Sequence, residues 1–126
     1  RGIKMAVTQS RDNRTLIAAA DLSSSQFLFA AMDAAGKAAV CGDGAQAFGV
    51  IEVGGTAAAA STITVSGKVM VKCGGTVTIG DDVSSDAAGK AVNSASGDII
   101  LGRAYEAGVT DQLIAIELVS TGNAHA

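Results

Sequence analysis

The chain has 126 residues and a formal net charge of −3 at pH 7, and this length fits a single domain. With 16 Gly, no Pro, three Phe, one Tyr and no Trp, it must fill a modest core with Val, Ile, Leu and Ala. No apolar run approaches the roughly 18 residues of a membrane helix, and the charged first twenty residues do not resemble a signal peptide. We therefore expect a soluble protein, made in a cytoplasm, with no membrane partner.

The charge is unevenly distributed along the chain. Residues 1–20 carry a net charge of +3, whereas residues 21–126 carry −6. A basic segment on an acidic body either docks onto an acidic partner or is a solvated terminus. The basic segment has no aromatic residue to stack on bases, and an acidic body repels a phosphate backbone. We therefore expect no nucleic-acid partner.

The start of the chain differs in pattern from the rest. Residues 1–21 lack a strong hydrophobic period, and we expect them to form an extended N-terminal arm. Residues 22–126 are expected to form a single β domain. One amphipathic helix within residues 15–31 is the alternative for this region.

The body of the chain reads as about eight short strands separated by Gly-containing turns. No segment supports a helix longer than two turns. The pattern predicts an all-β fold, a small Gly-rich β-barrel or sandwich. Gly49 is expected at a bulge or a close contact inside its strand. In chain order the predicted strands are residues 26–32, 38–41, 47–53, 61–66, 68–73, 76–79 (after a hairpin turn at Gly74–Gly75), 91–93, 99–105 and 113–119.

The hexapeptide DAAGKA occurs twice, at residues 33–38 and again 53 positions later at residues 86–91. The same offset superimposes three further pairs of glycines and keeps the order of turns and apolar segments. In each hexapeptide the Asp side chain can accept a turn-initiating hydrogen bond, and the Gly can supply a positive φ. Two copies are too few for a solenoid. The repeat therefore predicts a pseudo-symmetric barrel or sandwich built from two copies of one supersecondary unit.

The residues needed for catalysis or metal binding are scarce. The single histidine, His125, is next to the last residue, so a histidine-based triad is excluded. Cys41 and Cys73 lack the spacing and partners of a zinc site, and we expect them to be buried thiols rather than a disulfide. Asp81 and Asp82 are neighbours and are expected in a turn facing solvent. We expect no enzyme activity, no cofactor and no metal, which favours a structural or binding role.

Three segments occur in a characteristic order: Gly67–Val71 leading to Val77–Val83, Asp86–Val92, and Ile100–Ala107 followed by Leu113–Leu118. Taken in this order, they resemble the capsid cement, or head-decoration, proteins of tailed bacteriophages. Together with Phe48–Val50 the resemblance covers residues 26–119. It implies a non-enzymatic protein on the exterior of the virion capsid, assembled in the host bacterial cytoplasm, with the major capsid protein and itself (as a homotrimer) as partners.

A physical argument, separate from the resemblance, suggests where a capsid would be bound, because the N-terminal arm is longer and more basic than the family leads us to expect. An extended arm could add a strand to a sheet edge of the capsid protein, with Arg11 and Arg14 pairing with capsid carboxylates. The loop at residues 54–60 is the alternative contact. Two other functions stay open: another phage structural module, such as a tail or spike component or a self-assembling scaffold, and an enzyme or small-ligand carrier using Lys72. The predicted capsid-binding residues are Val7, Arg11, Arg14, Leu16 and Ile17.

Overall fold

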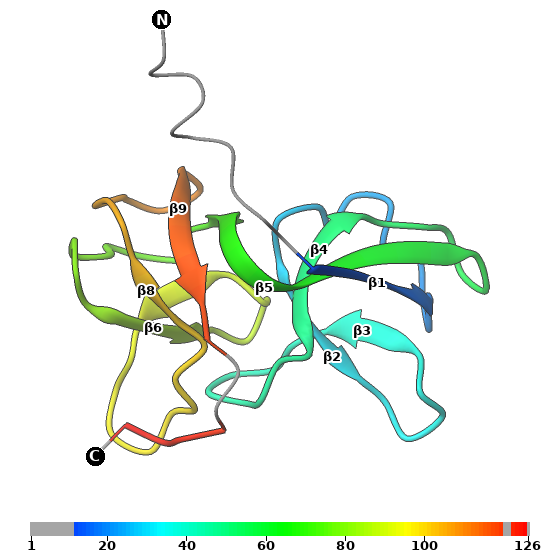
Figure 1. The fold of residues 1–126 in the computed structure, drawn as a ribbon, viewed down its shortest axis with the longest axis horizontal. Helices are drawn as coiled ribbons and strands as arrows, with labels where there is room; N and C mark the ends of the chain where they lie inside the picture. Colours follow the sequence, from blue (N-terminus) through cyan, green and yellow to red (C-terminus); the bar gives the residue numbers. More distant parts are fainter. Residues whose placement is uncertain (1–11, 120–121, 126) are drawn as a thin grey trace, which may run out of the picture.

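The computed structural model describes residues 12–119 and 122–125, and all regular structure within them is β-strand (Figure 1). The predicted all-β class is therefore confirmed. None of the described residues forms a helix long and apolar enough to cross a membrane. The strands are β1 (Asp12–Ile17), β2 (Phe29–Met32), β3 (Ala38–Val40), β4 (Gly49–Val53), β5 (Ala60–Lys72), β6 (Asp82–Ser85), β7 (Ala91–Asn93), β8 (Gly102–Ala104) and β9 (Leu113–Leu118).

All nine strands belong to one curled antiparallel sheet, in the order β3-β2-β4-β5-β9-β8-β6-β7, with β1 also pairing with β5. The long strand β5 runs across both halves of the molecule (Figure 1). Residues 60–66 of β5 pair with β1 and β4, and residues 67–72 pair with β9. We call residues 12–66 the first half and residues 67–119 the second half.

Each half curls into an almost closed five-stranded barrel. In the first half a parallel bridge between Ala18 and Ala38 brings the chain after β1 back to β3. In the second half the bridge between Cys73 and Ala91 does the same for β5 and β7. The prediction of a small β-barrel is therefore confirmed, and the barrel motif occurs twice.

The internal repeat seen in the sequence is also a repeat of structure. Strands β2 and β3 become β6 and β7 when 53 is added to every residue number. The pairing of Phe29 with Val50 likewise becomes that of Asp82 with Arg103. The two hexapeptides form the same turn, in which Gly36 has a φ of 79° and Gly89 a φ of 78°. The DAAGKA segment thus connects β2 to β3 and β6 to β7.

Two sequence expectations about the second half were wrong. Residues 76–79 do not form a strand after a hairpin at Gly74–Gly75; Val77 makes only an isolated bridge to Gly108. Asp82 is not in a loop but begins β6, while Asp81 is in the preceding turn region. In addition, the two strands predicted at residues 61–66 and 68–73 are one continuous strand, β5.

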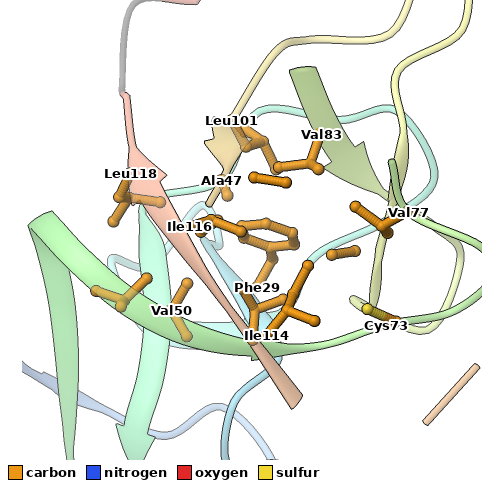
Figure 2. Packing of buried hydrophobic residues seen from close by; sticks show 14 of the residues in the cluster. Phe29, Ala47, Val50, Cys73, Val77, Val83, Leu101, Ile114, Ile116 and Leu118 are labelled. Carbon is orange, nitrogen blue, oxygen red and sulfur yellow. The ribbon is translucent and has the colours of Figure 1, made fainter. Parts of the chain in front are cut away.

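The apolar core consists of two clusters. The smaller lies inside the first half and includes Ile51 and Ile63, both fully buried. The larger fills the second half but also contains Phe29 and Val50 from the first half. Figure 2 shows the Phe29 ring among side chains of the second half. The outer surface of the first barrel is thus part of the core of the second, and this joins the two halves into one domain.

Gly49 confirms the expected close contact. A Cβ atom at this position would collide with the carbonyl oxygen of Thr64 on the neighbouring strand. Gly102, its equivalent in the second half, meets the carbonyl oxygen of Glu117 in the same way. Glycine at both positions lets neighbouring strands approach where each barrel curves.

Candidate docking surfaces

Strand β1 is one candidate surface, because it pairs with β5 alone among the described strands. Polar side chains of β5 and β1 bond to each other and support this pairing: Ser66 Oγ donates a hydrogen bond to Asp12 Oδ2 at 2.9 Å. Thr64 Oγ1 lies 2.9 Å from Asn13 Oδ1. The other edge of β1 presents backbone groups that can pair with an incoming strand.

The structure separates the residues predicted to bind a capsid. Val7 and Arg11 lie outside the described residues. Arg14 and Leu16 pair with the inward-facing residues of β5, and Leu16 packs partly buried against the core of the first half. Ile17, on the opposite face of β1, is 42% exposed. The three described residues therefore do not form a single surface facing outward.

The alternative contact, the loop at residues 54–60, is tied to the domain. The Leu22 N–H donates to the Gly55 carbonyl at 2.8 Å, and the Gly55 N–H donates to Ser61 Oγ at 2.8 Å. Residues 56–58 are exposed. The loop thus exposes a short segment whose ends are fixed to the domain by hydrogen bonds.

A second candidate surface, missed by the sequence reasoning, is a hollow of about 620 Å³ on the outer face of the second half. Strands β6, β8 and β9 supply most of its walls. The lining combines apolar and charged side chains. Its residues are Asp82, Ile100, Gly102, Arg103, Ala104, Tyr105, Glu117, Val119 and Asn123.

The polar side chains of this hollow are bonded to one another. Tyr105 Oη donates to Glu117 Oε1 at 2.6 Å, and this bond raises the pKa of the Tyr105 hydroxyl. Lys68 Nζ lies 4.8 Å from the centre of the tyrosine ring, within cation–π range. Arg103 forms an ion pair with Asp82 at 3.2 Å. These contacts link the exposed polar side chains in and beside the hollow to one another.

Alternation along two short segments could have identified the hollow. Arg103 and Tyr105 are two residues apart after β8 begins, so they point to the same face of the sheet. Glu117 pairs directly with Arg103 across β8 and β9, which places it on that face as well. The sequence pattern alone predicted no site in this region.

The cysteines are on neither surface. Cys41 and Cys73 are free and buried, as the sequence reasoning expected, and burial raises the pKa of both thiols. A buried thiol with a raised pKa is a poor nucleophile. Among the described residues, no three histidine, cysteine or acidic side chains gather in a way that could hold a metal ion.

Comparison with known proteins gives a likeness in structure but none in sequence. No protein-family model matches the chain, and no curated protein matches it in sequence. Among solved structures it is similar to the N base of the head fiber gp8.5 of bacteriophage phi29, with a TM-score of 0.68 and 14% identity. The match covers 92% of this chain and 100% of that chain. At this identity the likeness establishes a shared all-β fold.

Proposed function

We propose that this chain is a non-enzymatic structural protein of a bacteriophage, which binds the outer surface of the head and cements it as a homotrimer. The observation that carries the proposal is the fold, shared over 92% of the chain with the base of a phage head fiber. The ordered sequence motifs that resemble head-decoration proteins support it independently. The proposal places the protein on the capsid exterior after assembly in the host bacterial cytoplasm.

The physical character of the surface supports this role. The large hollow combines apolar and paired charged side chains, a composition that suits contact with another protein surface. Many identical weak contacts on a repeating lattice give strong attachment, since each bound contact raises the effective concentration of the next. A small domain that repeats over a shell needs no single strong site.

For the contact with the major capsid protein we propose the segment that contains Val7 and Arg11. Leu16 is a poor candidate because it packs against the domain's own core. The segment directly precedes β1. Because β1 is paired with β5, the segment would leave the domain at a defined position. Arg11 would pair there with carboxylates of the capsid protein.

Binding to purified expanded heads of the encoding phage tests the proposal. Saturable binding at a fixed ratio to the major capsid protein is the expected result. A variant lacking residues 1–11, which keeps β1 intact, is expected to fold with an unchanged circular-dichroism spectrum and to lose head binding. Charge reversal at the exposed Asp43 serves as a control that keeps the segment.

Other results would overturn the proposal. Binding at a vertex alone, or to tails, would indicate a tail or spike component. Absence of binding to any part of the particle would remove the virion role. Head binding unchanged by the deletion would contradict the attachment segment and move the contact to the loop at residues 54–60.

A further inference from the structure

The two halves have equivalent folds but different surroundings. Besides the offset of 53, strand β1 matches residues 67–72 of β5 with an offset of 55. The pairing of Arg14 with Ile63 becomes that of Val69 with Ile116. The bridge from Ala18 to Ala38 becomes that from Cys73 to Ala91. Each contact between the halves can therefore be compared with the matching position on the outside of the domain, which no other described strand covers.

The hollow of the second half has a counterpart in the first half that is already filled. Val50, Ile51, Glu52 and Thr64 match Arg103, Ala104, Tyr105 and Glu117. In the first half these residues surround only about 50 Å³, because Val69 and Met70 of β5 cover them. The matching hollow in the second half measures about 620 Å³. Within the described residues, no strand covers it as β5 covers its counterpart.

The core of the first half is open where that of the second half is closed. Leu16, Phe48 and Val65 are partly exposed. Their equivalents in the second half are nearly or fully buried, under side chains that include Phe29, Ala47 and Val50 of the first half (Figure 2). These equivalents are Val71, Leu101 and Leu118.

We propose that a second copy of this chain closes both openings at once. Strand β1 and the open core of one copy dock on the hollow of the next copy. In this contact β1 of one copy packs on the second half of the next copy in the same way that residues 67–72 pack on the first half within one chain. The proposal names the surface of the homotrimer proposed above, and in that respect rests on it, but it requires no capsid.

Charge complementarity supports this partner. The residues that cover the filled hollow, Val69 and Met70, correspond to Arg14 and Thr15 of β1. Arg14 is basic and exposed. The lining of the open hollow includes Glu117 and the Asp82–Arg103 ion pair. Inside the chain Val69 lies beside Thr64, the equivalent of Glu117, so between copies Arg14 would lie beside the Glu117 carboxylate.

Exposed apolar residues support it as well. Inside the chain, the Lys72 N–H donates to the Phe27 carbonyl at 2.9 Å, beside Gln26. In the contact between copies, Ile17 of one copy takes the place of Lys72. Ile79 and Gly80 of the other copy take the places of Gln26 and Phe27. Ile17 is 42% exposed and Ile79 is 62% exposed. The contact between copies would bury two isoleucines that each copy leaves in water.

Cross-linking tests the geometry of this contact. Ile17→Cys and Ile79→Cys variants are prepared separately, with the buried Cys41 and Cys73 left in place. We expect a disulfide-linked dimer when the two variants are mixed and oxidised, and none from either variant alone, because the contact joins different surfaces. A linked dimer from Ile17→Cys alone, or no linkage in the mixture, would overturn the proposal.

Sedimentation velocity tests its energetics. The unmodified chain is expected to sediment as a multimer of the 12.3 kDa protomer. Arg14→Glu and Glu117→Lys are each expected to weaken self-association by roughly tenfold or more, since they place like charges together. The double variant is expected to recover most of this loss. Asp43→Lys is the control and should leave the sedimentation unchanged.

The remaining outcomes separate this proposal from the proposed function. A chain that becomes multimeric only when residues 1–11 are deleted would show that its own segment fills the site, and would overturn the inference. A strict monomer that binds heads at a fixed ratio would also overturn it, together with the proposed homotrimer, while leaving the proposed head binding intact. A multimer that forms the expected cross-link but does not bind heads would support this inference and overturn the proposed head binding.

Discussion

Phe29 and Asp82 occupy equivalent positions in the two halves, but Phe29 is completely buried and Asp82 lines an open hollow. The difference follows from the order of the halves along the chain. The second half packs on the outer face of the first, so the first residue of β2 becomes core. Within the described chain no further unit packs on the second half, and the first residue of β6 is charged.

Replacing Phe29 therefore tests how the halves are joined. Phe29→Ala is expected to lower the free energy of unfolding by about 3–5 kcal/mol, because it leaves a cavity among the buried side chains of the second half. Asp82→Ala at the equivalent position should change it by about 0.5 kcal/mol or less. Urea denaturation followed by circular dichroism measures both. Similar losses for the two variants would contradict the unequal roles.

The two hexapeptide glycines make a second matched pair. Gly36→Ala is expected to cost about 1–2 kcal/mol, since alanine is strained at a φ of 79° but meets no atom within 4 Å. Gly89→Ala has the same strain and also brings its Cβ to 2.7 Å from Val40 Cγ1 and 3.1 Å from the Phe29 carbonyl oxygen. Thermal melting should therefore show a clearly larger loss for Gly89→Ala. Equal losses would place the second hexapeptide away from the first half.

The aspartates of the hexapeptides hold their turns through two backbone hydrogen bonds each. Asp33 Oδ1 accepts from the N–H groups of Ala35 and Lys37 at 2.9 and 2.8 Å. Asp86 Oδ1 makes the equivalent bonds at 2.8 and 2.9 Å. Asp→Ala at either position is expected to lower the unfolding free energy by about 1–2 kcal/mol, whereas Asp→Asn should retain most of it. An Asn variant as unstable as the Ala variant would disprove the bonding scheme.

The hydroxyl of Tyr105 provides a pH-dependent signal from the hollow. Its pKa is raised above the usual 10.0 chiefly by the hydrogen bond to Glu117. Because the folded pKa is raised, the stabilisation exists below pH 10 and is lost as the pH rises through the folded pKa. Tyr105 is the chain's one tyrosine, so ultraviolet absorbance follows it directly. Glu117→Ala should lower the pKa toward 10.0; an unchanged titration would show that the bond does not form.

Burial of the two thiols predicts their reactivity. With Cys41 and Cys73 buried and their pKa values raised by desolvation, a disulfide reagent should react slowly with the native chain. Both thiols should react at once in denaturant. Mass spectrometry of the product counts the modified residues. Rapid labelling of either thiol in the native chain would show that the core around it opens.

The repeat was the strongest signal in the sequence, because its offset superimposes turns, strands and pairing alike. Strand β6 was missed because Val83 is its one apolar residue. Its hydroxyls are satisfied by tertiary contacts: Ser84 Oγ donates to the Ile99 carbonyl at 2.7 Å. Residues 76–79 alternate like a strand, but among them only Val77 forms a β-bridge to another segment. Local periodicity does not reveal whether a neighbouring strand is present.

The docking surfaces were less predictable. Sequence reasoning placed β1 within an arm because its residues lack a clear period, and five of the six are exposed in the structure. The hollow depends on the pairing of β8 with β9 and on the fact that no other strand of the described chain covers it. Neither condition follows from local pattern, since the equivalent strands of the first half are covered by residues 67–72 of β5.

The most direct measurement is an electron cryo-microscopy reconstruction of expanded heads incubated with the purified chain. We expect density for this β domain on the outer surface at a fixed ratio to the capsid protein. Within each group of copies, β1 of one copy should lie in the hollow of the next. Heads without this density, or with isolated copies whose hollows face solvent, would contradict the account.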